Sequence, residues 1–313
     1  MDEKRWLTIN EQIAHLRARG VQFEKMDEAA AREQLQQENN FFRLTAYRKN
    51  YPKHPGGPRQ GQYVRLDVAY LVDLAEIDRV LRDLVLGMAL DVEHSVKMEI
   101  LQLAEAHHED GYSMVHDFAA GLDEKERRIL DGEIARNRHN TYCGGLVSKY
   151  DGHFPVWVFL ELLSFGKLCS FYRFCAQRYE RPEMLKNHYR LRMCQTLRNA
   201  AAHNSCILND LGGRSTRIKT DPVINREIAA IPGMSKAFRV SKMKNERVQQ
   251  LATLLYTYRL MEGQHASWQL EQRKMALFVE RLRKNEHFYD DNELLRNTFD
   301  FIRLLIDNWY GIR

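Results

Sequence analysis

The stretch that decides the fold is residues 67–106, DVAYLVDLAEIDRVLRDLVLGMALDVEHSVKMEILQLAEA. Apolar side chains recur every three or four residues between Leu71 and Ile100, and charged residues occupy the other face. This period is typical of an amphipathic helix. Because the run is longer than the usual globular helix, it predicts two helices or one long kinked helix. Asp78 and Arg82, four residues apart and opposite in charge, are expected to form an ion pair.

Helical periodicity also runs through most of the remaining chain. The pattern predicts further helices over 9–19, 26–35, 122–136, 156–172, 182–206, 241–261 and 267–309. The strongest break is the loop 51–63, which is rich in proline and glycine. No two alternating runs are joined by an Asn-Gly or Asp-Gly turn, so no hairpin is indicated. We therefore expect an all-α fold, a bundle of many helices.

The chain divides by pattern into three parts. Residues 1–50 form an N-terminal helical part, residues 65–215 form the helical core, and residues 220–313 form a C-terminal helical extension. A chain of 313 residues is long enough for one large core or two modest ones, and the three parts are expected to pack into one compact unit. Neither an internal repeat nor a low-complexity tract interrupts them.

Composition excludes several classes of protein. Hydrophobic residues at 44% and charged residues at 28% are ordinary for a globular protein, and a net charge of +5 permits nucleic-acid binding without requiring it. The N-terminus lacks a signal-peptide pattern, and no apolar run reaches the length of a membrane span. The five cysteines include no CxxC pair. These features predict a cytoplasmic protein with reduced thiols and without a membrane segment, metal site or cofactor.

Chemistry is indicated by one short segment, LRNAAAHN at residues 197–204. Arg198 offers a permanent forked cation for phosphate oxygens, and His203 titrates near neutral pH, so it can serve as acid or base. Asn199 and His203 are four residues apart and share a helix face, so the amide is expected to orient the imidazole. These are the groups that RNA cleavage without a metal needs.

Spacing alone does not establish this site. Five Arg/His pairs in the chain are separated by four to six residues, about as many as chance predicts. The alternative interpretation is a histidine packed between helices and an arginine in a surface ion pair. Only the pair at Arg198 and His203 has a polar residue after the arginine and a spacer of small, helix-forming alanines.

Four blocks of sequence resemble, in order, the blocks of the Abi-like abortive-infection family (AbiD and AbiF types). The resemblance covers roughly residues 9–210. The blocks are Asn40-Phe41-Phe42-Arg43-Leu44-Thr45-Ala46-Tyr47, the helix from Leu74 to Lys97 with Ile77-Asp78-Arg79, the segment from Phe154-Pro155-Val156-Trp157 to Ser164-Phe165-Gly166-Lys167-Leu168, and Arg198-Asn199-Ala200-Ala201-Ala202-His203-Asn204 with Asn209. The chain departs from the family pattern at Phe41-Phe42 and Thr45-Ala46 in the first block, and at Lys97, where arginine is typical.

The resemblance implies a fold and an activity. It implies a helical bundle of the HEPN type and a metal-independent endoribonuclease that acts as a toxin in phage defence. It also implies a homodimer, an RNA substrate, and a neutralising RNA or protein as antitoxin. The catalytic residues carried over are Arg198, Asn199 and His203, with Asn204, Asn209, Glu93 and Lys97 in support.

Further RNA contacts are expected from basic and aromatic residues near loops: Arg43, Tyr47, Arg48, Arg214, Arg217 and Lys219. The alternative is that these residues form the solvated edge of a loop. Glu93 and Lys97 likewise fit either a helix ion pair or a contact that positions the catalytic residues from a facing helix.

Two other functions remain open on the sequence. One is a non-catalytic RNA-binding regulatory module, which would bind RNA with strong salt dependence and cut none. The other is a helical protein that senses a phage component and passes the signal to another effector. Neither of these functions requires Arg, Asn and His at the spacing found in residues 198–203.

Overall fold

The computed structural model describes residues 5–213, 216, 218–262 and 267–312. The expected all-α fold is confirmed: fifteen α-helices form, and within the described ranges the only β-pairing is two isolated bridges. The α-helices are α1 (Ile9–Ala18), α2 (Glu28–Glu33), α3 (Phe41–Ala46), α4 (Val68–Ala106), α5 (Ser113–Ala120), α6 (Glu124–Asn137), α7 (Gly144–Tyr150), α8 (Val156–Leu162), α9 (Phe165–Arg178), α10 (Pro182–Ala202), α11 (Pro222–Ala229), α12 (Lys236–Met243), α13 (Glu246–Glu262), α14 (Ser267–Lys284) and α15 (Glu293–Tyr310).

The helices fall into two compact units. Unit 1 contains Met1–Gly87, Leu197–Tyr256 and Ala266–Arg313, and unit 2 contains Met88–Thr196 and Thr257–His265. Three helices, α4, α10 and α13, contribute residues to both units. None of the helices in the described ranges combines the length and the apolar character needed to cross a membrane.

The stretch that begins at Asp67 forms one continuous helix of 39 residues, α4. Asp67 fixes its start: its Oδ1 accepts from Ala69 N–H at 2.9 Å, and its Oδ2 accepts from Glu24 N–H at 2.8 Å. Gly87 lies within the helix without breaking it, and because it has no side chain, Glu271 of α14 can lie close to the backbone of α4. A Cβ added there would lie 2.8 Å from Oε1 of Glu271 in α14.

Three of the expected helices are interrupted by capping residues. The predicted helix 241–261 is divided into the end of α12 and α13, where the side chain of Asn245 accepts from Val248 N–H at 3.2 Å. The predicted helix 156–172 is divided into α8 and α9, because Ser164 caps α9 by accepting from Lys167 N–H at 3.4 Å. The predicted helix 267–309 is divided into α14 and α15, where the side chain of Asn292 accepts from Leu295 N–H at 3.1 Å. Capping side chains satisfy the orphan N–H groups at a helix start, so they create new boundaries inside long apolar patterns.

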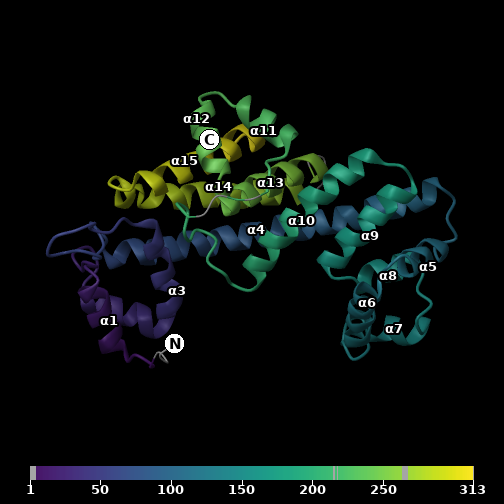
Figure 1. Ribbon diagram of the computed structural model, residues 1–313, viewed down its shortest axis with the longest axis horizontal. Helices are drawn as coiled ribbons and strands as arrows, with labels where there is room; N and C mark the ends of the chain where they lie inside the picture. Colours follow the sequence, from purple (N-terminus) through teal and green to yellow (C-terminus); the bar gives the residue numbers. More distant parts are fainter. Residues whose placement is uncertain (1–4, 214–215, 217, 263–266, 313) are drawn as a thin grey trace. The chain divides into compact units, whose positions relative to one another are not determined.

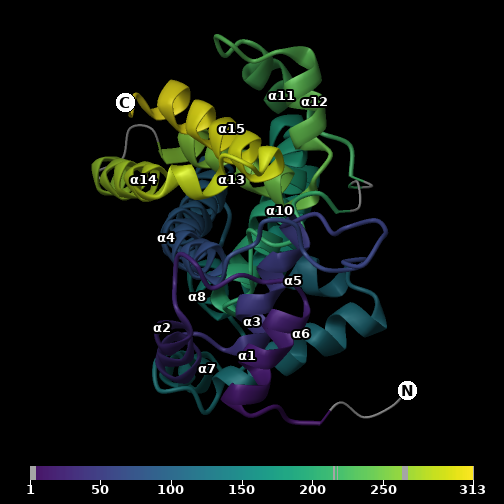
Figure 2. The same cartoon turned by 90° about the vertical axis from the view of Figure 1, so that its left-hand side faces the viewer.

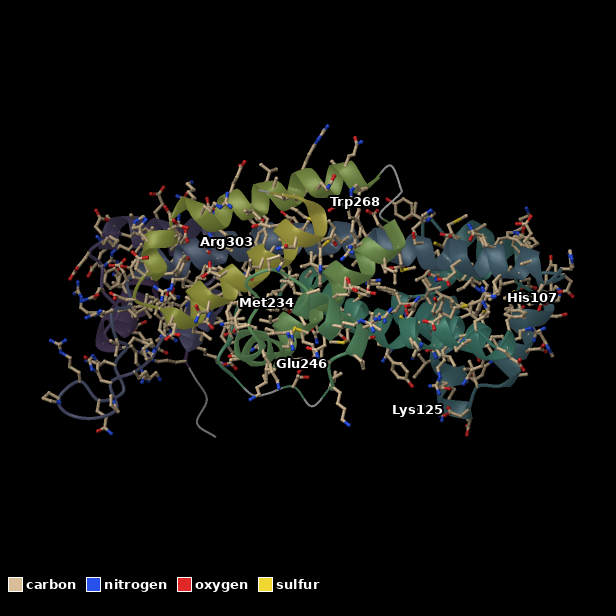
Figure 3. All side chains as sticks on the ribbon, turned by 90° about the horizontal axis from the view of Figure 1, so that it is seen from above. His107, Lys125, Met234, Glu246, Trp268 and Arg303 are labelled. Atoms are coloured by element: carbon tan, nitrogen blue, oxygen red, sulfur yellow. The ribbon has the colours of Figure 1, made fainter. Side chains whose placement is uncertain are left out.

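In unit 1 the C-terminal helices are anchored to the first half of α4. Arg281 of α14 donates to Asp73 Oδ1 of α4 at 2.6 Å, and Tyr289 donates to Oδ2 of the same buried carboxylate. Figure 1 labels the ribbons of the two helices that the Arg281 contact joins, α4 and α14. Helices α14 and α15 lie side by side in Figure 2. Trp268, labelled in Figure 3, stacks on Tyr310 with ring centroids 4.9 Å apart.

A buried carboxylate joins three distant segments of unit 1. Asp78 of α4 is completely buried; its Oδ2 accepts from Tyr47 Oη at 2.8 Å, and its Oδ1 accepts from Leu208 N–H at 2.7 Å. Arg82 also donates to Asp78, so the ion pair predicted from their spacing forms. Both partners are buried, however, whereas the pattern assigned them to the charged face.

The segment after α10 is held by two buried asparagines. Asn50 donates through Nδ2 to Leu208 O at 2.7 Å and accepts at Oδ1 from Leu211 N–H at 2.9 Å. Asn245 donates to Leu211 O at 3.0 Å. Backbone groups of this non-helical segment are thereby satisfied by side chains. The chain directly beyond α10 therefore has a fixed path.

Unit 2 is built around an aromatic core. Phe118 of α5 meets Phe171 of α9 edge to face with centroids 5.0 Å apart, and Phe159 of α8 meets Phe171 at 5.3 Å. Such edge-to-face pairs add to the free energy gained from burying the rings. Lys97 of α4 donates to Glu161 Oε2 at 3.1 Å.

We expect Asn50→Ala to destabilise the protein by about 3 kcal/mol, because it leaves a buried carbonyl and a buried N–H without partners. The measurement is the midpoint of urea unfolding followed by circular dichroism. Asn308→Ala, on the exposed side of α15, is the matched control and should change stability by less than about 0.5 kcal/mol. Equal midpoints for the two variants would contradict the bracing role of Asn50.

Candidate functional site

The candidate site lies at the C-terminal end of α10, in unit 1. The helix ends at Ala202, four residues before the predicted end, because Asn204 adopts a left-handed conformation with φ +57°. Ser205 N–H then bonds Ala200 O at 2.8 Å, and Asn204 N–H bonds Ala201 O at 2.9 Å. This pair of bonds is the Schellman arrangement, in which asparagine is the usual alternative to glycine at the left-handed position.

Arg198 and Asn199 are joined by their side chains. Nη1 of Arg198 donates to Oδ1 of Asn199 at 3.1 Å, and both residues are half-buried. The amide oxygen therefore fixes one arm of the guanidinium. No hydrogen bond in the described part of the chain connects the Asn199 side chain with His203, although the spacing suggested that the amide would orient the imidazole. The amide orients the arginine.

His203 is the residue at which the helix stops. Its backbone N–H donates to Asn199 O at 2.9 Å, and its side chain is exposed. An exposed imidazole at a helix end is open to solvent and to a ligand. Of the alanines between Arg198 and His203, only Ala201 is buried. Their small side chains leave the polar groups of this turn accessible to a bulky ligand.

The supporting residues beyond the helix have different roles. Asn204 provides the left-handed turn. Asn209 is half-buried, and its Oδ1 accepts no hydrogen bond from the described residues. Cys206 contacts the carbonyl of Arg43 at 3.8 Å, and burial raises the pKa of its thiol. The thiol is therefore protonated at neutral pH and unsuited to act as a nucleophile.

The predicted RNA-contact residues separate into buried and accessible ones. Tyr47 is completely buried against Asp78, so it belongs to the core and does not reach RNA; this corrects its assignment as a contact. Arg43 and Arg48 are half-buried, and Arg48 also donates to Thr45 O at 3.0 Å. Lys219 is exposed. The remaining two expected contacts, Arg214 and Arg217, lie outside the described residues.

Glu93 and Lys97 belong to unit 2, whereas the candidate site belongs to unit 1. Lys97 is paired with Glu161 of α8, which links the second and third of the sequence blocks described above. Around the described residues, no group of three or more His, Cys, Asp or Glu side chains is arranged to hold a metal ion.

Sequence reasoning missed the residues that hold the site in place. The sequence pattern placed Asp78 on the charged face of the helix as half of an ion pair, and it indicated no role for Asn50. Burial raises the pKa of the Asp78 carboxyl, against the opposing effect of its hydrogen bond from Leu208. Asp78 follows Ile77 directly and lies three residues before Leu81, within the apolar pattern of the helix. A carboxylate in such a position is the signal that could have revealed the burial of Asp78.

The family model described as "Abi-like protein" matches residues 34–209, more than half of the chain, and the chain belongs to this family. The matched region contains Tyr47, Asp78 and the whole turn from Arg198 to Asn204. Membership supports a role in abortive infection. No curated protein and no solved structure shows a significant match to the chain.

The left-handed conformation of Asn204 leads to a prediction about the stability of the protein. Asn204→Ala should lower stability by about 1 kcal/mol, because a Cβ-bearing residue without a polar side chain is disfavoured at positive φ. Asn204→Gly should be neutral or slightly stabilising. Thermal unfolding of the two variants provides the comparison. If alanine and glycine behave alike, the left-handed turn does not limit stability.

Proposed function

We propose that this Abi-like protein is a HEPN-type endoribonuclease that acts in the cytoplasm as a toxin in phage defence. The observation that carries the proposal is the turn at the end of α10, where Arg198 is held by Asn199 and His203 is exposed. A permanent cation and an exposed imidazole on one fixed turn are two of the groups that phosphodiester cleavage requires.

Each residue has one role in the proposed reaction. Arg198 binds the phosphate that is attacked, and its forked guanidinium matches two phosphate oxygens. Asn199 positions that guanidinium through the 3.1 Å hydrogen bond. His203 transfers a proton, either from the attacking 2′-OH or to the leaving 5′ oxygen. The attack by the 2′ oxygen leaves a 2′,3′-cyclic phosphate without the aid of a metal ion.

A second proton-transfer group is needed, because the reaction both removes and donates a proton. No other histidine is present between residues 189 and 264. We propose that a second copy of the chain supplies it in a homodimer, so that two Arg198–His203 turns face one RNA strand. A neutralising RNA or protein would restrain this activity during normal growth.

Expressing the wild-type chain should arrest growth and fragment cellular RNA, and His203→Ala should lower the cleavage rate about 10²–10⁴-fold. Arg198→Lys should also lower it, because lysine keeps the charge and loses the fork. The rate is measured on a labelled RNA in EDTA, where cleavage should persist. His139→Ala, which changes an exposed histidine of unit 2, is the matched control and should behave as wild type.

Two results would remove the enzyme proposal. If the purified chain binds RNA with a steep salt dependence but cuts none, the non-catalytic regulatory module replaces it. If Arg198→Lys and His203→Ala both keep full toxicity in a folded protein, the sensing function replaces it. Circular dichroism of each variant separates lost chemistry from lost folding.

The homodimer makes a separate prediction about mixed subunits. His203→Ala chains, mixed with the wild-type chain and allowed to exchange, should lower the cleavage rate below that of the same amount of wild-type chain alone. The loss follows because a mixed dimer has one imidazole where the proposed shared centre needs two. An unchanged rate would show that each copy cuts with its own residues.

A further inference from the structure

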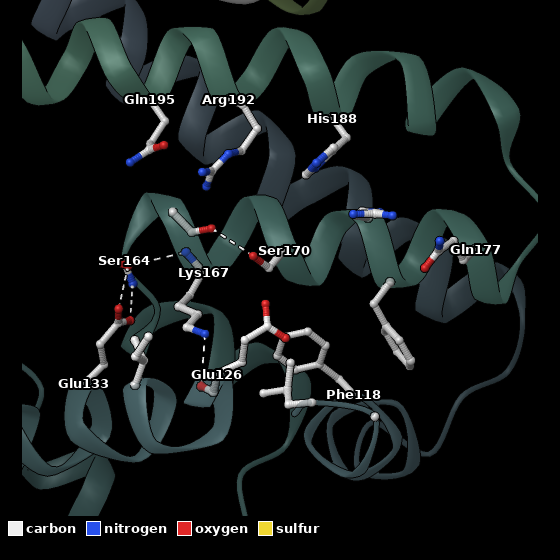
Figure 4. A pocket seen from close by; sticks show the side chains of 16 residues that line it. Phe118, Glu126, Glu133, Ser164, Lys167, Ser170, Gln177, His188, Arg192 and Gln195 are labelled. Atoms are coloured by element: carbon white, nitrogen blue, oxygen red, sulfur yellow. Dashed lines mark hydrogen bonds between the residues drawn. The ribbon is translucent and has the colours of Figure 1, made fainter. Parts of the chain in front are cut away.

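Unit 2 contains a groove that the proposed ribonuclease site does not use. Helices α6, α9 and α10 form its walls, and its volume is about 780 Å³ (Figure 4). This volume lies within the range of small-molecule sites, roughly 300–1,000 Å³. Its lining combines apolar side chains such as Leu122 and Ile129 with charged and amide groups. Such a mixture fits a ligand with both a flat apolar part and an anionic part.

A buried histidine faces this groove in one fixed protonation pattern. His188 is 8% exposed, and its Nδ1 lies 2.9 Å from Cys169 O. A carbonyl oxygen only accepts, so Nδ1 carries the proton. Burial, with Arg173 and Arg192 adding to it, lowers the pKa of His188, so the ring is neutral and Nε2 has a free lone pair. No described residue donates a hydrogen bond to that nitrogen.

The two arginines beside His188 supply the positive charge of the groove. Arg173 of α9 and Arg192 of α10 both line it and are exposed. Neither guanidinium forms an ion pair or a hydrogen bond with a described residue. Arg178 of the same unit, by contrast, is paired with Glu109 and Asp117. Two unpaired guanidinium groups around one groove are suited to a phosphate.

The opposite wall is acidic. Figure 4 shows Glu126 pointing from α6 into the groove, toward the helix that carries His188 and Arg192. Lys167 of α9 donates to the backbone carbonyl of Glu126 at 3.1 Å. The Glu126 carboxylate remains an acceptor in the groove that Arg173 and Arg192 also line. A ligand that fills the groove must present an anion on one side and hydrogen-bond donors on the other.

We propose that this groove binds a guanosine phosphate unit. Arg173 and Arg192 hold the phosphate, and the Nε2 atom of His188 accepts a hydrogen bond from a ribose hydroxyl. Glu126 accepts from the guanine edge, where the ring N–H and the amino group are adjacent donors that match the two oxygens of a carboxylate. The unit belongs either to a free guanine nucleotide or to a guanine within an RNA strand. This site goes beyond the proposed cleavage at Arg198 and His203.

The test is titration calorimetry on the full chain, in a His203→Ala background so that cleavage does not interfere. The titrants are GMP, UMP and two single-stranded RNA hexamers, one with a single guanine and one without. Arg173→Gln/Arg192→Gln should weaken guanine binding about tenfold or more. Arg136→Gln/Arg138→Gln removes the same charge from exposed residues of the same unit outside the groove, and should leave binding unchanged.

Two further readouts identify the contacts. Glu126→Ala should equalise the affinities for GMP and UMP. Bound GMP should shift the ¹⁵N resonance of His188 Nε2, while Nδ1 stays protonated. If GMP binds and the Arg173→Gln/Arg192→Gln variant weakens that binding, the ligand is a free nucleotide. If only the guanine-containing hexamer binds, and the same variant weakens its binding, the ligand is RNA. If neither ligand saturates, or if both double variants bind equally, the proposal is overturned.

Discussion

The arrangement of unit 1 depends on the burial of one carboxylate, that of Asp78. A buried charge is costly unless donors surround it, and here the hydroxyl of Tyr47, the guanidinium of Arg82 and the backbone N–H of Leu208 do so. These donors come from three separate parts of the sequence. Any alternative packing of α3, α4 or the segment after α10 would leave the charge uncompensated, so the carboxylate selects one arrangement among many that an apolar core would tolerate.

This constraint reaches the candidate site through a short path in the backbone. Leu208 is bound through its N–H to Asp78 and through its carbonyl to Asn50, four residues beyond the left-handed turn at Asn204. Both ends of the turn that carries His203 are therefore fixed, one by α10 and the other by buried side chains. A turn held in this way keeps an exposed imidazole in place without packing the ring itself, which leaves the ring accessible.

The sequence predicted the fold class because helical periodicity is a property of neighbouring residues, and α4 is the clearest example. The predicted helix boundaries were wrong where a single capping side chain decides them. Ser164 and Asn292 start new helices inside continuous apolar patterns. The sequence indicated the candidate site through Arg198, Asn199 and His203, but it did not indicate the contacts between these residues. The bond from Arg198 to Asn199 depends on rotamers, and the pairing of Asp78 with Leu208 joins residues 130 positions apart. Neither contact can be predicted from the spacing of residues along the sequence.

Helix α10 carries two histidines in opposite environments, and the contrast limits what each can do. His188 is buried, and a carbonyl fixes which nitrogen bears its proton, so the ring is a stationary acceptor. His203 is exposed at the helix end, so its ring is open to water and to a ligand. Acid–base catalysis needs a group that exchanges protons, whereas ligand recognition needs one whose donor and acceptor sides stay constant. The environments therefore argue for catalysis at His203 and recognition at His188, and not for the reverse.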